Sequence, residues 1–298
     1  MEVLDIMSVL KVENLSYHYE SGEGIRNISF EVEYGDCLAL IGKSGAGKST
    51  LMNTILGILP KAEGAVLVDD SLDIRDISFS PQNQAIDWYL DVFDNVYLEA
   101  LFDGSENGKA ETLAVLEKIG LGGKEKEDPT NLSGGQLQRV QLARQLVSKA
   151  KILMLDEPTS SLDVITSENI LNHLSSQCED GKICIISSHD LDMLEKYCNK
   201  VLYIDNGELV FFGGIDRFLK TYNHLNEYKI EHAGQLMEKA KKSIGQTFKV
   251  SEWNPLMVEI QEEQSLNMLL KLLIEQDIEI HSVEQNSRSL KEIIQLKG

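Results

Sequence analysis

The sequence predicts a three-layer α/β domain with an inserted helical subdomain, followed by a small C-terminal α+β domain. Short, fully apolar runs at 38–41, 152–155 and 183–186 are typical of strands buried on both faces of a parallel sheet. Helix-forming stretches lie between these runs, which indicates alternating strands and helices. The pattern changes after Gly213 and Gly214. A chain of 298 residues is also long enough for about two domains.

The first domain is expected to span residues 9–215. Its helical subdomain is expected at about 84–145, because residues 84–130 are rich in helix formers, with 11 acidic and 4 basic residues, and close with the helix-breaking run 128–131. Further strands are expected at 9–13 and 28–33. The expected helices lie at 48–57, 110–119, 135–148 and 163–177.

The remainder is expected to form a helical connector at 216–245 and a small α+β domain at 246–298. In this second domain the sequence pattern predicts strands at 247–250, 256–260 and 278–284. It predicts helices at 264–276 and 288–296.

The chain is strongly acidic, with a formal charge of -20 and a pI near 4.7. Residues 220–298 hold 10 basic and 12 acidic residues, so almost all of the excess lies before residue 220. This charge disfavours direct nucleic-acid binding, which relies on Lys and Arg. No run of about 18 to 20 apolar residues is present, and the N-terminus lacks the basic start of a secretory signal, so a cytoplasmic location is expected. The four cysteines form no CxxC pair and are expected to be buried thiols.

A glycine-rich run directly follows the apolar strand at 38–41 and opens the helix at 48–57. It consists of Gly42, Lys43, Ser44, Gly45, Ala46, Gly47, Lys48, Ser49 and Thr50. This is the GxxxxGKS/T pattern, whose backbone N–H groups surround phosphate oxygens at a helix N-terminus. Lys48 is expected to reach the β- and γ-phosphates and the Ser49 hydroxyl to bind Mg²⁺. A plain glycine-rich turn is the alternative.

An acidic pair, Asp156 and Glu157, closes the apolar strand at 152–155. The Asp could hold the hydration shell of Mg²⁺, and the Glu could polarise an attacking water. Taken alone, the pair would more simply be a strand-ending cap. A phosphate loop in the same chain favours the catalytic interpretation.

A second anion-attracting helix start is predicted at Leu132, Ser133, Gly134, Gly135 and Gln136. No second lysine-bearing loop accompanies it, so it cannot be an independent nucleotide site.

With these motifs the sequence resembles the ATP-binding cassette family, the nucleotide-binding subunits of ABC transporters, over about residues 9–215. The resemblance implies a RecA-like P-loop NTPase fold with an antiparallel β subdomain, and an ATPase that uses ATP and Mg²⁺. It assigns ATP binding to the 42–50 loop, Asp156 and residues 133–136, with Glu157 as general base. Gln82 resembles the glutamine that contacts Mg²⁺ and the attacking water, so the implied metal-binding residues are Ser49, Gln82 and Asp156.

Three further positions match the family in order. His189 resembles the switch histidine that contacts the γ-phosphate. Tyr19 resembles the aromatic residue that stacks on adenine, with Tyr17 as a competitor for that role. The run 161–163 resembles the D-loop, which crosses the interface of the cassette dimer.

The resemblance implies a head-to-tail homodimer or heterodimer in which Ser133, Gly134 and Gly135 of one chain cover the ATP of the other. It also implies a separate transmembrane permease, which would hold the cassette at the inner face of the cell membrane. Trp88 and Tyr89 are candidates for the groove that receives the permease. The alternative is that Trp88 packs under the helical insert.

The direction of transport depends on the C-terminal residues. The segment 280–294 resembles the strand and helix that end cassettes of drug, antibiotic-peptide and polysaccharide exporters with separate ABC-2-type permeases, although Lys291 stands where an acidic residue is more usual. Export is therefore expected. An importer cassette and a soluble ABC ATPase that moves no solute are the alternatives.

Overall fold

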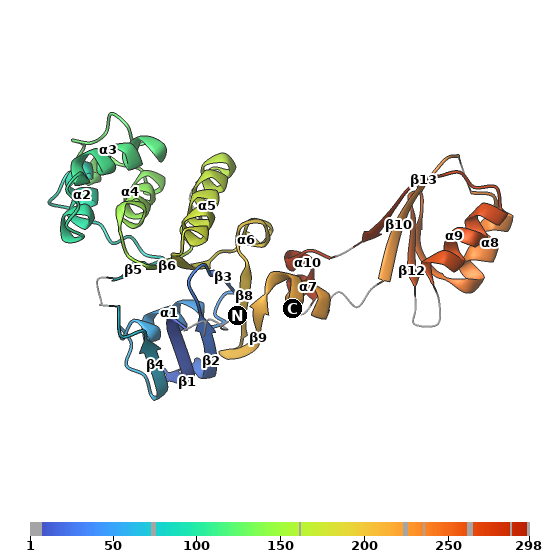
Figure 1. Ribbon diagram of the computed structural model, residues 1–298, viewed down its shortest axis with the longest axis horizontal. Helices are drawn as coiled ribbons and strands as arrows, with labels where there is room; N and C mark the ends of the chain where they lie inside the picture. Colours follow the sequence, from blue (N-terminus) through green and yellow to red (C-terminus); the bar gives the residue numbers. More distant parts are fainter. Residues whose placement is uncertain are drawn as a thin grey trace, which may run out of the picture. The chain divides into compact units, whose positions relative to one another are not determined.

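The computed structural model of the chain describes residues 8–72, 76–160, 162–222, 226–234, 236–260, 265–286 and 288–296. The chain divides into two compact units, Met1–Ile215 and Asp216–Gly298 (Figure 1). None of the helices in these described ranges is both long and apolar enough to cross a membrane.

The first unit is built on a six-stranded sheet of order β5-β6-β7-β3-β8-β9. The strands from β5 to β8 in this order are parallel, and β9 is an antiparallel edge. Three central strands are buried along their whole length, as their uninterrupted apolar runs predict. The strands are β3 (Cys37–Ile41), β5 (Ile77–Ser80), β6 (Ile152–Asp156), β7 (Ile183–Ser187), β8 (Lys200–Asp205) and β9 (Glu208–Gly214).

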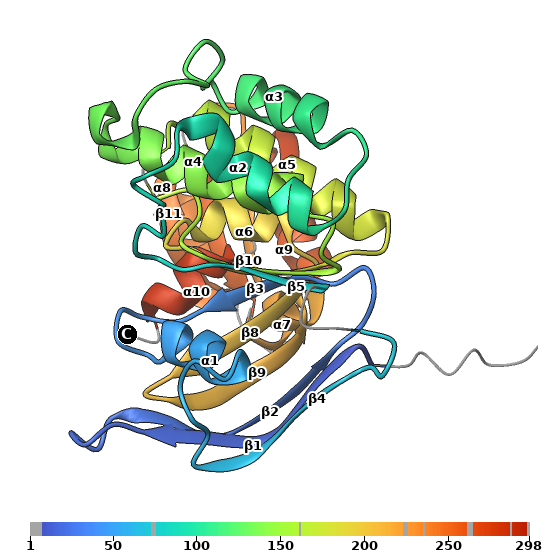
Figure 2. The same ribbon diagram turned by 90° about the vertical axis from the view of Figure 1, so that its left-hand side faces the viewer.

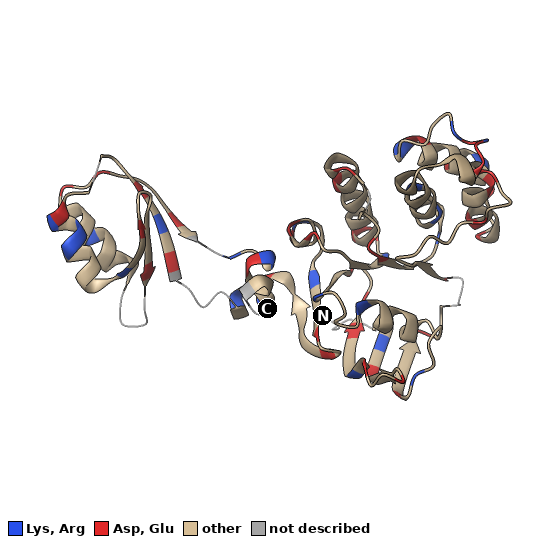
Figure 3. Ribbon diagram, turned by 180° about the vertical axis from the view of Figure 1, so that it is seen from behind, with Lys and Arg blue, Asp and Glu red and all other residues tan. Residues whose placement is uncertain are grey.

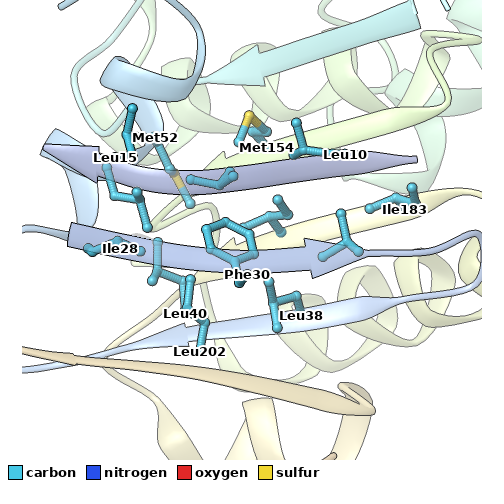
Figure 4. Packing of buried hydrophobic residues seen from close by; sticks show 14 of the residues in the cluster. Leu10, Leu15, Ile28, Phe30, Leu38, Leu40, Met52, Met154, Ile183 and Leu202 are labelled. Carbon is cyan, nitrogen blue, oxygen red and sulfur yellow. The ribbon is translucent and has the colours of Figure 1, made fainter. Parts of the chain in front are cut away.

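A three-stranded antiparallel sheet of order β2-β1-β4 covers one side of this unit, with α1 between the two sheets (Figures 1 and 2). Its strands are β1 (Leu10–His18), β2 (Gly24–Val32) and β4 (Glu63–Val68), and α1 spans Lys48–Ile55. A hydrophobic cluster fills the space between the sheets. Phe30 and Ile28 of β2 face Leu40 of β3 and Leu202 of β8, beside Met52 of α1 (Figure 4).

The opposite face of the six-stranded sheet carries the other helices of the first unit (Figures 1 and 2). The helical subdomain holds α2 (Val92–Phe102), α3 (Gly108–Lys118), a 3-10 turn (Pro129–Asn131) and α4 (Gly134–Val147). Helices α5 (Val164–Glu179) and α6 (Leu191–Tyr197) lie beside it. Acidic residues are frequent in α2 and the loops beside it (Figure 3).

The second unit contains a four-stranded antiparallel sheet of order β11-β12-β10-β13, with α8 and α9 on one face (Figure 1). In chain order its core is strand, helix, strand, strand, helix, strand. Leu269 and Leu273 of α9 pack on Leu256 and Val258 of β12. The elements are α7 (Ile215–Tyr222), β10 (Asn226–His232), α8 (Glu238–Thr247), β11 (Lys249–Trp253), β12 (Leu256–Ile260), α9 (Leu266–Glu275), β13 (Ile280–Asn286) and α10 (Leu290–Leu296).

The expectation of a helical connector at 216–245 is wrong for its middle part. Residues 226–232 form β10, which pairs with β12 on one side and β13 on the other. Tyr228 and Ile230 pack on the hydrophobic core of this unit, and Ile230 is fully buried. Burial between two strands outweighs the helix propensity of the Glu and Lys residues that alternate with them. The strand expected from Thr247 also begins later, because Thr247 ends α8.

Candidate nucleotide site

The glycine-rich loop joins the C-terminal end of β3 to the first turn of α1. Gly42 and Gly47 have positive φ values of 158° and 105°. A Cβ atom on Gly42 would overlap the backbone oxygen of Ile204, and one on Gly47 would lie 2.9 Å from Ile25 Cγ2. The loop therefore requires glycine at both positions, and it places the start of α1 where phosphate oxygens would meet free N–H groups.

Lys48, the first residue of α1, turns its side chain back over the loop. Its Nζ donates hydrogen bonds to the carbonyl oxygens of Gly42 at 2.8 Å and Lys43 at 3.2 Å. The side chain is largely buried, and burial lowers its pKa, an effect that nearby Glu157 and Asp156 oppose. An ammonium group held beside the loop is well placed for a phosphate.

Asp156 and Glu157 follow one another at the end of β6, and Ser187 at the end of the adjacent β7 holds them in place. Ser187 Oγ donates to Asp156 Oδ1 at 2.5 Å and accepts from the backbone N of Glu157 at 3.0 Å. The carboxyl ends of parallel strands meet at one edge of a sheet, so these carboxylates reach the edge where the glycine-rich loop begins.

Glu157 is unusual in both its backbone and its side chain. Its φ is 56°, in the left-handed region, and only 4% of its surface is exposed. His189 donates its backbone N–H to Oε2 at 3.3 Å, and His189 Nε2 lies 3.4 Å from Oε1. Oε1 is buried and accepts no hydrogen bond from the described residues. Burial raises the pKa of this carboxyl, an effect that His189 and Lys48 oppose.

A cleft of about 280 Å³ brings these groups together. Among the predicted site residues, it is lined by Tyr19, Ser44, Gly45, Gly47, Lys48, Ser49, Thr50, Gln82, Asp156, Glu157 and His189. The lining residues come from five separate segments of the sequence, so the fold itself assembles the cleft.

Three residues of the glycine-rich run do not line this cleft. Gly42 and Lys43 contribute the carbonyl oxygens that hold Lys48. Ala46 is buried, and its carbonyl oxygen accepts a hydrogen bond from the backbone N of Gly207 at 3.0 Å. These residues shape the loop and its lysine.

Tyr19, rather than Tyr17, faces the cleft. Tyr19 is 41% exposed, and its hydroxyl lies 3.4 Å from Thr50 Oγ1. Tyr17 packs against the hydrophobic core and meets the Tyr19 ring edge-on, with ring centroids 4.7 Å apart. The core contact fixes Tyr17 and leaves the Tyr19 ring at the cleft.

Two residues that line the cleft, Glu23 and Gly24, were not predicted. They belong to the hairpin between β1 and β2, four and five residues after Tyr19. Gly24 has a φ of 150°, and a Cβ there would overlap the backbone of Tyr17. The closely spaced Gly22 and Gly24 after an aromatic residue were the available sequence signal.

Residues 133–136 do not line the cleft of their own chain. They begin α4, where Ser133 Oγ accepts from Gln136 N at 3.3 Å and Gln136 Oε1 accepts from Ser133 N at 2.9 Å. This reciprocal capping box leaves the backbone at Ser133 and Gly134 exposed. The helix start thus presents the N–H groups of Gly134 and Gly135, which the capping box does not use, on the surface of the helical subdomain.

Known proteins match this sequence and fold. A family model described as "ABC transporter" matches residues 25–160. The methionine import ATP-binding protein MetN of Clostridioides difficile is 32% identical over 234 residues, which cover 74% of this chain and 73% of that protein. The chain belongs to the ABC transporter family.

Two further comparisons, with a curated relative and with a solved structure, cover about two thirds of the chain. The macrolide export ATP-binding/permease protein MacB of Mannheimia succiniciproducens is 36% identical over 223 residues, 68% of this chain but only 34% of that longer protein. The solved dimeric ATP-binding cassette MJ0796, in a post-hydrolysis state with ADP and phosphate, matches with a TM-score of 0.62 and 29% identity, covering 69% of this chain and 98% of that one. The first unit therefore has the P-loop NTPase fold of an ABC ATPase.

Two other predicted regions of this ABC cassette can be placed. Trp88 is 48% exposed and Tyr89 99% exposed, so Trp88 is not packed beneath the helical insert. In the predicted D-loop, Asp163 caps α5 by accepting from Thr166 N at 2.9 Å, whereas Ser161 lies outside the described residues.

Proposed function

We propose that this cassette binds and hydrolyses ATP and thereby drives transport through a separate membrane-spanning permease. One observation carries the proposal. The glycine-rich loop, the acidic pair at the end of β6, Gln82 and His189 converge on one cleft from separate parts of the sequence. An anion cradle and a buried carboxylate in one cleft are what phosphoryl transfer to water requires.

The loop and Lys48 are proposed to hold the phosphates, with Tyr19 stacked on the adenine ring. The donor set also fits Mg²⁺, because the Ser49 hydroxyl, the Gln82 amide and the Asp156 carboxylate supply the hard oxygen ligands that this ion prefers. When bound, Mg²⁺ neutralises charge on the β- and γ-phosphates. Ser187 orients the Asp156 carboxylate toward this role.

Glu157 is proposed as the general base. Its buried Oε1 has hydrogen-bonding capacity that no described residue uses, which suits an attacking water. The raised pKa also makes this carboxylate a stronger base than an exposed glutamate. His189, in contact with both carboxylate oxygens, is proposed to position the carboxylate and contact the γ-phosphate.

Each site is proposed to be completed by a second cassette, either an identical chain or a related one. The exposed start of α4 supports this, because Ser133, Gly134, Gly135 and Gln136 form an anion-attracting helix end that does not reach the cleft of its own chain. Facing two chains head to tail would place each helix end over the other chain's ATP.

Glu157→Gln tests both parts of the proposal. The variant removes the base but keeps the size of the side chain, so it should bind ATP, fail to hydrolyse it and accumulate as an ATP-dependent dimer in light scattering. Lys48→Ala is the matched control and should lose ATP binding. Hydrolysis retained in Glu157→Gln would exclude this base, and an ATP-bound variant that stays monomeric would exclude the dimer.

The proposed partner is a permease of the ABC-2 type, with the cassette on the cytoplasmic face of the membrane and a drug or antibiotic peptide exported. The support is the strand β13 followed by the short helix α10 near the end of the chain. Matched relatives include proteins named for export and for import, so direction needs its own test. Purified cassette and permease in vesicles should concentrate substrate on the side away from the cassette, and accumulation on the cassette side would mean import.

A further inference from the structure

All four cysteines of the chain meet in one buried cluster, away from the candidate nucleotide site. Cys37 begins β3, and Cys184 lies beside it in parallel register on β7. Cys178 lies in the last turn of α5 and Cys198 directly follows α6. All four are free thiols and none lines the nucleotide cleft. The fold thus brings four cysteines that are far apart in the sequence into one buried cluster.

Within this cluster, Cys37 and Cys198 are placed to form a bond. The Cys37 thiol donates to Cys198 Sγ at 3.6 Å. Asn199 joins the two backbones, since Cys37 N donates to Asn199 Oδ1 at 3.0 Å and Asn199 N donates to Cys37 O at 2.9 Å. A disulfide needs a sulfur separation of about 2 Å. Because the backbones are already adjacent, small side-chain rotations could close the gap.

The surroundings assign different roles to the two sulfurs. Cys198 is 9% exposed and each of the other three cysteines 2% or less, so Cys198 is the most accessible of the four to a small oxidant from solvent. Hydrogen bonds to Cys178 and Cys198, together with burial, raise the pKa of Cys37 and keep it a neutral thiol. Such a thiol is a poor first target for an oxidant but can react with a sulfur that is already oxidised.

We propose that Cys37 and Cys198 form a reversible disulfide, with a small hydroperoxide as the oxidant. In the first step Cys198 takes one oxygen from hydrogen peroxide, giving a sulfenic acid and water. Cys37 then attacks that sulfur, the S–O bond breaks, and the departing hydroxide takes the Cys37 proton to form a second water. Two thiols and one peroxide give one disulfide and two waters. A dithiol reductant reverses the change by thiol–disulfide exchange.

The bond would join the start of β3 to the turn between α6 and β8. This turn already hydrogen-bonds to β3 through Asn199, so the folded geometry should change little. The crosslink would close a long loop in the unfolded chain and lower its entropy. Oxidation should therefore raise the melting temperature and leave ATP affinity unchanged.

The test treats the full-length protein with hydrogen peroxide, then blocks the remaining thiols under denaturing conditions and counts them by mass spectrometry. The count should fall from four to two, a peptide pair joined through Cys37 and Cys198 should appear, and dithiothreitol should restore four thiols. Four thiols remaining would overturn the proposal, as would a disulfide that joins any other pair. Zinc bound stoichiometrically to the untreated protein would also overturn it, in favour of a metal site.

Two variants sharpen the test. In Cys198→Ser, all the remaining thiols should still be counted after peroxide treatment, and no disulfide should form. Cys184→Ser is the matched control from the same cluster. Because the sulfur of Cys184 contacts Cys178 and the Leu174 carbonyl, this variant should still form the Cys37–Cys198 bond. A disulfide lost equally in both variants would contradict the assigned pair. Mapping in the unaltered protein decides the question even if a variant does not fold.

Discussion

At the scale of single residues, Glu157 has the environment of a proton acceptor. It is buried beside Asp156, and the side chains of Lys48 and His189 lie close to it. Desolvation favours the neutral form of the carboxyl, so the basicity of the ionised form rises. The same burial that makes this residue chemically useful also makes its charge costly to the fold.

The pH dependence of hydrolysis should reveal this environment. Burial raises the pKa of Glu157 above the ordinary value of 4.5, so protonation of the base should stop hydrolysis at a higher pH than an exposed glutamate would. Rates measured across an acidic pH series should decline over that range, while binding of a fluorescent ATP analogue persists. An acidic limb at the ordinary glutamate pKa would contradict the assignment.

A stability measurement checks the same residue independently. The folded chain holds the Glu157 proton more tightly than the unfolded chain does, so this group's contribution to folding declines as pH rises through its raised pKa. Glu157→Gln carries no such charge. Its melting temperature should exceed that of the unaltered protein at neutral pH, and the difference should shrink on acidification. A difference that grows on acidification would mean that the carboxylate stabilises the fold.

At the scale of elements, the glycine-rich loop depends on backbone shapes that only glycine adopts without strain. Gly47→Ala would place a Cβ 2.9 Å from Ile25 Cγ2 at a φ of 105°, a strain of about 1 to 3 kcal/mol. ATP affinity, measured by calorimetry, should fall about fivefold or more. The control is Gly57→Ala, which has a φ of 70° but no atom within 4 Å of the new Cβ. Equal losses of ATP affinity in the two variants would show that the contact between a Cβ at position 47 and Ile25 does not affect ATP binding.

Removing the N-terminal cap from two different helices distinguishes a structural role of the capping residue from a catalytic one. Ser133→Ala removes the cap of α4 and Ser265→Ala the equivalent cap of α9, where Ser265 Oγ accepts from Met268 N. Each should lower stability by about 1 kcal/mol in chemical denaturation. Only Ser133→Ala should also reduce ATP hydrolysis, because α9 lies in the second unit. Similar hydrolysis rates in the two variants would show that Ser133 is not part of the ATP site.

The elements also show what the sequence could and could not predict. The fully apolar strands β3, β6 and β7 were predicted because burial on both faces leaves no polar position. Strand β10 was missed: its Glu and Lys residues favour a helix by composition, whereas Tyr228 and Ile230 alternate with them at the spacing of a strand, which pairs on both edges. In the site, motifs predicted the residues of the loop and the acidic pair. Glu23 and Gly24 come to the cleft only through the pairing of β1 with β2.

At the scale of the whole molecule, net charge should govern how cassettes associate. Each chain carries -20, so two identical chains repel one another. Dimerisation of Glu157→Gln with ATP should therefore strengthen as sodium chloride is raised, because the screening length falls below about 10 Å above 0.1 M. Light scattering across a salt series measures this, with ADP as the control that should give no dimer. Dimers that weaken with salt would indicate attractive charge pairs at the interface.

The left-handed backbone conformation at Glu157 lowers the stability of the fold at the residue proposed to act as general base. A φ of 56° costs glutamate free energy that glycine or asparagine would largely avoid. Replacing this residue with glycine or asparagine would relieve both its backbone strain and its buried charge, so a laboratory screen for thermal tolerance alone would reward the loss of the proposed base. Any engineering of this cassette for robustness should therefore select for phosphate release at every round.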